Sequence, residues 1–279
     1  MKNKNLSLAY STCPNDTFLF HALAFNLIDL NNLSYKIELD DVETLNRKAS
    51  LQTFDISKLS FAAIGQYQET YGLLRTGAAL GRGCGPLLIA KPGYKIKNSE
   101  TVKIAIPGLQ TTANLLLSLW LGKKANVVPM TFDEIMPAVI NGQYDFGVII
   151  HEGRFTYQNH GLECVVDLGQ WWEAETSLPI PLGGIAVQRS LPDEIIKQVE
   201  SSIGQSVNYA FNNKTVSKGY IKQHAMELSD DVIEQHIDLY VNDFTKELGR
   251  EGENAVQYLF EMARQKGVIP DSKQPLFAV

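Results

Sequence analysis

Four short apolar runs in this sequence each end in a polar segment, and this pattern limits the possible folds more than any other feature. The runs end at Tyr10, Ile56, Ile106 and Ile150. The residues that follow each run are of the kind that open a helix or carry a reactive group. In α/β proteins, ligands bind at the carboxyl ends of strands, where the N-termini of helices point. We therefore expect the four segments to line one cleft.

The middle of the chain alternates between predicted strands and predicted helices. The predicted elements are strands at 102–106, 127–130 and 146–150 and helices at 112–121 and 131–141. Leucines at helical spacing support the first helix, and Thr131 with Glu134 forms a capping-box pattern for the second. This βαβαβ order predicts parallel strand pairing.

The first hundred residues predict a second α/β region, and the end of the chain predicts helices. The predicted elements are strands at 6–10, 35–39 and 54–56 and helices at 42–51, from Phe61 onward, at 195–207, at 229–248 and at 251–266. Two apolar segments, 85–92 and 183–189, are flanked by glycine or proline and resemble each other. We interpret them as the two crossings between lobes.

These elements together predict an α/β, two-lobed periplasmic-binding-protein-like fold (type II) with C-terminal helices. Residues 1–90 and 185–279 would form a discontinuous first lobe with the helical tail, and residues 91–184 the second. The ligand cleft would lie between the lobes. The fold hosts receptors, regulators and enzymes, so it does not decide the function.

Charge and cysteine spacing narrow the possible partners. A net charge of −6 argues against nucleic acid and anionic membranes as partners, but a small anionic substrate is compatible with it. Cys13, Cys84 and Cys164 are far apart, and no histidine pair has metal-ligand spacing, so we expect reduced thiols and no metal. The N-terminal apolar stretch is too short for a signal peptide, and a cytoplasmic protein is expected. Whether the chain is a monomer or a homodimer stays open.

His151 is the main candidate for catalysis. It follows an apolar run directly, so its ring should project at the carboxyl end of a strand, where it can act as a general base. Arg154 and Tyr157 lie close enough in sequence to orient it or to bind substrate. The alternative interpretation is a solvent-facing histidine in a loop.

Two further segments are candidates for binding an anion. Lys58, Leu59 and Ser60 precede a helix, and lysine and serine side chains suit a carboxylate; the alternative is a solvated lysine with an N-cap serine. Thr112 and Ala113 open another helix, whose N–H groups and partial positive charge attract anions; the alternative is a plain threonine cap. The glycines of 81–85 lack the strand-to-helix context of a dinucleotide loop.

Several longer segments resemble the 1,4-dihydroxy-6-naphthoate synthase family of the futalosine route to menaquinone. The segments are 11–18, 41–46, 81–86, 149–157 and 166–172, and the similarity runs nearly from end to end. Thr12, where some relatives are expected to have proline, is a departure with no obvious cost, and the candidate site itself shows no departure.

The resemblance implies a reaction and a set of site residues. The reaction converts cyclic dehypoxanthine futalosine to 1,4-dihydroxy-6-naphthoate and releases a dihydroxyacetone fragment, and it implies no redox or metal cofactor. The family's catalytic histidine corresponds to His151, and its substrate contacts to Lys58-Leu59-Ser60 and Thr112-Ala113. The alternatives are chorismate dehydratase, which shares the pathway and fold, and a solute-binding protein without catalytic activity.

Overall fold

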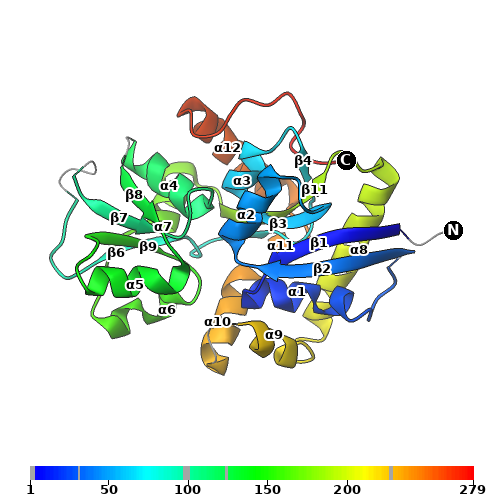
Figure 1. Cartoon of the computed structure of the whole chain (residues 1–279), viewed down its shortest axis with the longest axis horizontal. Coiled ribbons are helices and arrows are strands. Elements are labelled where there is room, and N and C mark those ends of the chain that lie inside the picture. Colours follow the sequence, from blue (N-terminus) through cyan, green and yellow to red (C-terminus); the bar gives the residue numbers. More distant parts are fainter. Residues whose placement is uncertain (1–3, 31, 97–100, 123–124, 226–228) are drawn as a thin grey trace.

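The chain forms two lobes, each built on one sheet (Figure 1). The computed structural model describes residues 4–30, 32–96, 101–122, 125–225 and 229–279. The first sheet contains β1 (Lys4–Ser11), β2 (Leu33–Asp40), β3 (Ile56–Ser60), β4 (Tyr71–Leu73), β5 (Ala79–Gly81) and β11 (Ile180–Gln188). The second sheet contains β6 (Leu87–Ala90), β7 (Lys103–Ile106), β8 (Asn126–Pro129), β9 (Phe146–Ile149) and β10 (Glu163–Asp167).

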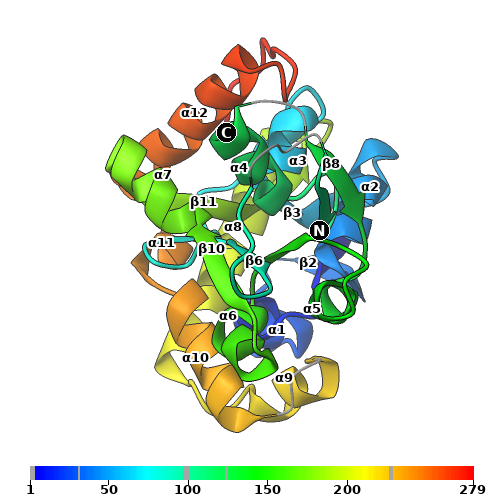
Figure 2. The ribbon, with the colours of Figure 1, turned by 90° about the vertical axis from the view of Figure 1, so that its left-hand side faces the viewer.

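Helices cover both faces of each sheet. The helices up to the second crossing are α1 (Pro14–Ala24), α2 (Val42–Ser50), α3 (Phe61–Gln66), α4 (Thr112–Leu121), α5 (Phe132–Ile140), α6 (Gly153–Thr156), with a 3₁₀ turn at Tyr157–His160, and α7 (Leu168–Thr176). The later ones are α8 (Asp193–Asn212), α9 (Lys218–His224), α10 (Asp230–Tyr240), α11 (Asp243–Lys246) and α12 (Gly249–Gln265). In the second lobe, α4 and α7 cover one face and α5 the other (Figure 2). Within the described ranges, no helix combines the length and apolar character that crossing a bilayer requires.

Strand pairing confirms the parallel units that the sequence predicts. The first sheet has the order β2-β1-β3-β11-β4, in which β1 is parallel to β2 and β3. The second has the order β10-β6-β9-β7-β8, in which β7 is parallel to β8 and β9. The carboxyl ends of these parallel strands lie at the edge of each sheet where a ligand site is expected.

Local signals set the ends of several helices as expected. α4 begins after Thr111, whose side chain accepts the Asn114 N–H, and ends at Gly122 with φ +62°. The capping box of α5 is present, with the Glu134 carboxylate accepting the Thr131 N–H at 3.2 Å. Both patterns satisfy backbone groups that the first helical turn leaves unpaired.

Two predicted elements are wrong. The segment after Ile56 is not a loop: β3 continues to Ser60 and is wholly buried, because it pairs with β11 on its far side. The helix predicted over 229–248 stops at Tyr240, and Asn242 caps a new short helix by accepting the Phe244 N–H at 2.9 Å. This break leaves Tyr240 at the end of α10, next to the site described below.

Strand pairing moves the boundaries between the two parts of the chain. β6 ends at Ala90, which the sequence assigned to the first lobe, but it pairs with β9 and β10 in the second sheet. β11 begins at Ile180, which the sequence assigned to the second lobe, but it pairs with β3 in the first sheet. A division by sheet therefore falls before Leu87 and before Ile180 rather than at 90/91 and 184/185.

Candidate functional site

One cavity lies where the two lobes meet. Its walls include Ser11, Lys58, Pro107 and His151, one residue from each of the four segments that follow an apolar run. The cavity and its mouth, which opens to solvent, together hold about 590 Å³ of space that no atom fills. Lys58, Leu59, Ser60, Thr112, Ala113 and His151, the candidates from sequence, all line it.

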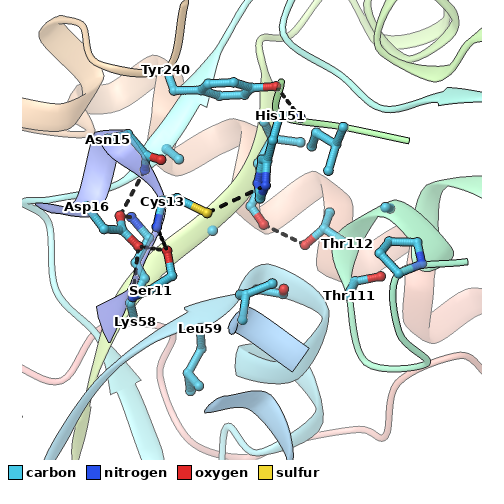
Figure 3. A pocket seen from close by; sticks show the side chains of 18 of the residues that line it. Ser11, Cys13, Asn15, Asp16, Lys58, Leu59, Thr111, Thr112, His151 and Tyr240 are labelled. Carbon is cyan, nitrogen blue, oxygen red and sulfur yellow. Dashed lines mark hydrogen bonds and ion pairs between the residues drawn. The ribbon is translucent and has the colours of Figure 1, made fainter. Parts of the chain in front are cut away.

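His151 is held at the cavity by residues from three other elements (Figure 3). Its ring nitrogen Nδ1 lies 3.5 Å from the Cys13 sulfur, and its backbone N–H donates to the Tyr240 hydroxyl at 3.3 Å. The ring stacks on Phe132 with centroids 5.0 Å apart. Its φ of +59° is uncommon for a residue other than glycine, and such conformations concentrate at functional sites.

The surroundings of His151 favour its neutral form. Burial lowers the pKa of the imidazole below 6.5, and the Lys58 ammonium lowers it further. The carboxylates of Glu152 and Asp16 oppose this shift without reversing it. The ring is therefore mostly unprotonated at neutral pH, which is the form a general base requires.

Lys58 does not present a free charge to the cavity. Its Nζ forms a buried ion pair with Asp16 at 2.9 Å and donates to the Gly77 carbonyl at 3.0 Å. Asp16 also accepts hydrogen bonds from the Ser11 hydroxyl at 2.7 Å and the Asn15 amide at 2.8 Å. Lys58 therefore lines the cavity as half of a neutral pair.

Leu59 and Ser60 complete the end of β3. The Leu59 side chain is fully buried in the core. Ser60 exchanges two hydrogen bonds with the Asn46 side chain: its N–H donates at 2.9 Å, and its hydroxyl accepts at 3.0 Å. The hydroxyl of Ser60 still has its own proton to donate, so it remains able to bind an anionic group.

Thr112 joins the two lobes at the start of α4. Its hydroxyl donates to the Leu182 carbonyl at 2.6 Å and accepts the Ala62 N–H at 3.3 Å. Both partners belong to the first lobe. The side chain is thereby used in holding the lobes together. Thr112 and Ala113 line the cavity, and the N–H groups of a first helical turn have no partner within the helix, so these groups remain available to an anion.

Sequence reasoning missed the contribution of α10. His236 is fully buried, lies 5.5 Å from His151 between ring centroids, and has a ring nitrogen, Nε2, 2.9 Å from Asn15 Oδ1. Burial first, and then the neighbouring His151, lower the pKa of His236 well below 6.5. No local motif marks His236 or Tyr240, because only the fold brings α10 to the cavity.

Two arginines near the glycine-rich segment, Arg154 and Arg82, lie away from the cavity. Arg154 donates to the carbonyls of Gly83 and Gly85 and pairs with Asp167 at 3.1 Å, so it fixes the glycine-rich segment. Arg82 pairs with Glu251 at 2.8 Å on the surface. Asn15, by contrast, lines the cavity.

The part of the chain that the structure describes holds no cluster of three or more histidine, cysteine, aspartate or glutamate side chains placed to bind a metal ion. The polar groups of the cavity are instead one neutral histidine, one thiol, hydroxyl groups, the Asn15 amide, the Lys58–Asp16 ion pair and helix N–H groups. Such a set suits proton transfer on an anionic organic molecule.

The chain is similar to a protein family and to proteins named for one reaction. The family model described as menaquinone biosynthesis matches residues 6–265. A 1,4-dihydroxy-6-naphthoate synthase of Thermus thermophilus is 43% identical over 98% of both chains. Another, of Streptomyces coelicolor, is 40% identical over 97% of this chain and 96% of its own.

Solved structures support the fold that the sequence predicted. A protein of Archaeoglobus fulgidus is 34% identical, with a TM-score of 0.88 over 95% of this chain and 98% of its own. The alkanesulfonate-binding protein of Xanthomonas axonopodis pv. citri, bound to MOPS, is 14% identical, with a TM-score of 0.70 over 97% and 96%. The periplasmic-binding-protein-like fold is thereby confirmed, and the second similarity concerns the fold alone.

Proposed function

This chain belongs to the menaquinone-biosynthesis family, among its 1,4-dihydroxy-6-naphthoate synthases, and from that membership we propose its reaction. It is an enzyme, and we propose that it converts cyclic dehypoxanthine futalosine to 1,4-dihydroxy-6-naphthoate with release of a dihydroxyacetone fragment. The observation that carries the proposal is the nearly full-length relationship to two synthases, combined with one neutral histidine in the cavity. A cytoplasmic location is proposed with it, since both relatives are named as synthases.

We propose His151 as the general base. Nδ1 of its ring lies at Cys13, and Nε2 has no hydrogen-bond partner among the described residues. Nε2 removes a proton from a substrate carbon next to a carbonyl group, and the electron pair of the broken C–H bond passes to the carbonyl oxygen. Cleavage of a carbon–carbon bond in the sugar-derived part then follows, and formation of the aromatic ring drives it.

We propose that the substrate carboxylate binds at the start of α4. The N–H groups of Thr112 and Ala113 and the partial positive charge of the helix N-terminus favour an anion there, by about 0.3–1 kcal/mol for the helix charge alone. The Ser60 hydroxyl donates a further hydrogen bond. Lys58 and Leu59 shape the wall, and Lys58 acts through Asp16 rather than as a separate cation.

The test is incubation of the purified protein with cyclic dehypoxanthine futalosine and analysis of the products by mass spectrometry. We expect 1,4-dihydroxy-6-naphthoate and dihydroxyacetone in equal amounts. Chorismate serves as the control substrate, and its dehydration in place of the expected reaction would favour chorismate dehydratase. Tight binding of cyclic dehypoxanthine futalosine without conversion would contradict the proposal and favour a solute-binding protein.

A further inference from the structure

The thiol of Cys13 contacts a ring nitrogen of His151. Cys13 is the N-cap residue of α1, and its N–H donates to the Ser11 hydroxyl at 3.3 Å, which in turn donates to Asp16. The thiol is thereby fixed to the first lobe, while His151 belongs to the second. Their 3.5 Å contact spans the cavity.

The contact between Sγ and Nδ1 has two possible directions. If Nδ1 carries the ring proton and donates it to sulfur, Nε2 keeps a lone pair and can accept a proton. If the thiol donates to Nδ1, the ring proton lies on Nε2, which then cannot act as a base. The hydrogen bond made by one ring nitrogen decides the protonation of the other.

We propose that Cys13 is a positioning residue, which holds His151 in the tautomer with the proton on Nδ1 and so leaves Nε2 free to act as the base. The inference rests on the proposed function, because it assigns a role within that reaction. During proton transfer the Nδ1–H bond to sulfur is kept, and the substrate proton forms the new Nε2–H bond, so His151 becomes an imidazolium beside a neutral thiol.

A neutral sulfur suits this task better than a carboxylate. A carboxylate partner would stabilise the imidazolium and raise the pKa of His151, and so reduce the unprotonated fraction at neutral pH. Sulfur is a weak acceptor that directs the proton without adding charge. Burial, with the nearby carboxylates of Glu152 and Asp16, raises the pKa of the Cys13 thiol and keeps it protonated.

Other contacts of His151 restrain its backbone and ring plane rather than its tautomer. Tyr240 accepts its backbone N–H, Phe132 stacks on the ring, and His236 packs against the ring at a tilt of 54°, with 5.5 Å between centroids. Within the described ranges, Cys13 is the one hydrogen-bond partner of a ring nitrogen of His151.

Any pH profile of the enzyme must be interpreted with every ionisable group near His151 in view. These groups are Cys13, Asp16, Lys58, Glu152, His236 and Tyr240. His236 is neutral itself because burial lowers its pKa strongly. The net result for His151 in the free enzyme is a lowered pKa, so kcat/KM should rise as the pH increases through a value below 6.5 and stay level above it.

The first part of the test measures the tautomer directly by ¹⁵N NMR of the enzyme labelled at its histidines, with His151→Asn used to assign the signal. We expect the proton on Nδ1 of His151 in the wild-type enzyme and a shift toward the Nε2–H tautomer in Cys13→Ala. A wild-type ring protonated on Nε2, or a tautomer unchanged by Cys13→Ala, would overturn the proposal. This measurement needs no turnover, so its outcome is separate from that of the proposed function.

The second part compares three variants of Cys13 in turnover. Cys13→Ala should lower kcat about 10- to 100-fold at nearly unchanged KM, the usual cost of losing the partner of a functional histidine. Cys13→Ser keeps an acceptor and should restore much of the rate. Cys13→Asp should move the rising limb of the pH profile to higher pH, because its carboxylate raises the pKa of His151.

The control is Cys164→Ala, which makes the same chemical change at an exposed cysteine on β10. It should leave rate, KM and tautomer as in the wild type. If the wild type and Cys13→Ala turned over alike while His151→Asn was inactive, the proposed function would stand and the role of Cys13 would be refuted. Unfolding curves of Cys13→Ala and Cys13→Ser separate a loss of rate from a loss of fold.

Discussion

The two walls of the cavity differ in how completely their polar groups are paired. On the wall formed by β1, β3 and the start of α1, Asp16 accepts hydrogen bonds from Ser11 and Asn15 and forms an ion pair with Lys58. All of these contacts are within 3.3 Å. On the wall that follows β7 and β9, His151 has one contact to sulfur at 3.5 Å. Buried charges are stable only when paired, whereas a catalytic base needs an unpaired atom.

The difference assigns separate roles to two groups of side chains. Asp16 and its partners form a neutral, hydrogen-bonded group, and changes to that group should affect the stability of the fold. His151 has a positive φ and few polar contacts, and changes to His151 should affect turnover. The following substitutions test that separation.

The largest effect is expected for His151→Asn. Asparagine tolerates the positive φ of this position but cannot act as a base, so kcat should fall about 10²- to 10⁴-fold with little change in KM. Steady-state kinetics with cyclic dehypoxanthine futalosine measure this. Thermal unfolding should be nearly unchanged, and a rate close to that of the wild type would show that another group is the base.

Lys58→Met should have the next largest effect, on stability. It leaves the buried Asp16 carboxylate without its cation, which costs about 3–5 kcal/mol of unfolding free energy. Urea unfolding gives the value. The matched control, Lys58→Met with Asp16→Asn, removes both charges and should lose much less; equal losses in the single and double variants would contradict the ion-pair interpretation.

Thr112→Val should have an intermediate effect. Valine keeps the shape but leaves the Leu182 carbonyl and the Ala62 N–H without their partner, which costs about 1–3 kcal/mol. Denaturant unfolding measures the loss, and Thr112→Ser, which keeps the hydroxyl, is the control. If valine and serine were equally stable, the hydroxyl would not hold the lobes together.

Arg82→Ala should have the smallest effect. Its ion pair with Glu251 is solvent-exposed, and such pairs contribute less than about 1 kcal/mol. Unfolding and kcat/KM should both stay near wild-type values. Arg154→Ala is the contrasting control, because Arg154 pairs with Asp167 in a mostly buried position and should destabilise the protein more. A large loss of activity in Arg82→Ala would mean that this arginine reaches the substrate.

Local sequence signals predicted much of the second lobe. The bounds of α4 agree with the prediction at both ends, and the capping box of Thr131 and Glu134 is present. The position of His151 just after a strand followed from the apolar run that precedes it. Capping and hydrophobic periodicity act over about four residues, so a single sequence contains the information that they need.

Long-range pairing explains where the prediction failed. The polar residues at 57–60 indicate a loop. β3 nevertheless continues there, because it pairs with β11, which lies more than a hundred residues later in the chain. The free lysine expected at position 58 is paired with Asp16, 42 positions earlier. Local secondary-structure propensity does not decide the outcome where distant residues supply the hydrogen-bond and ionic partners that buried polar groups need.

By itself, the sequence determined the two α/β lobes, the cleft at four strand ends and His151 as the candidate base. The tertiary structure decided which atoms of that cleft are still free. It brought Tyr240 and His236 into contact with His151. It also placed the Cys13 sulfur next to Nδ1 of His151 and paired the Lys58 charge with that of Asp16. These outcomes depend on contacts between residues far apart in the chain, and only packing of the whole fold brings such residues within hydrogen-bonding distance.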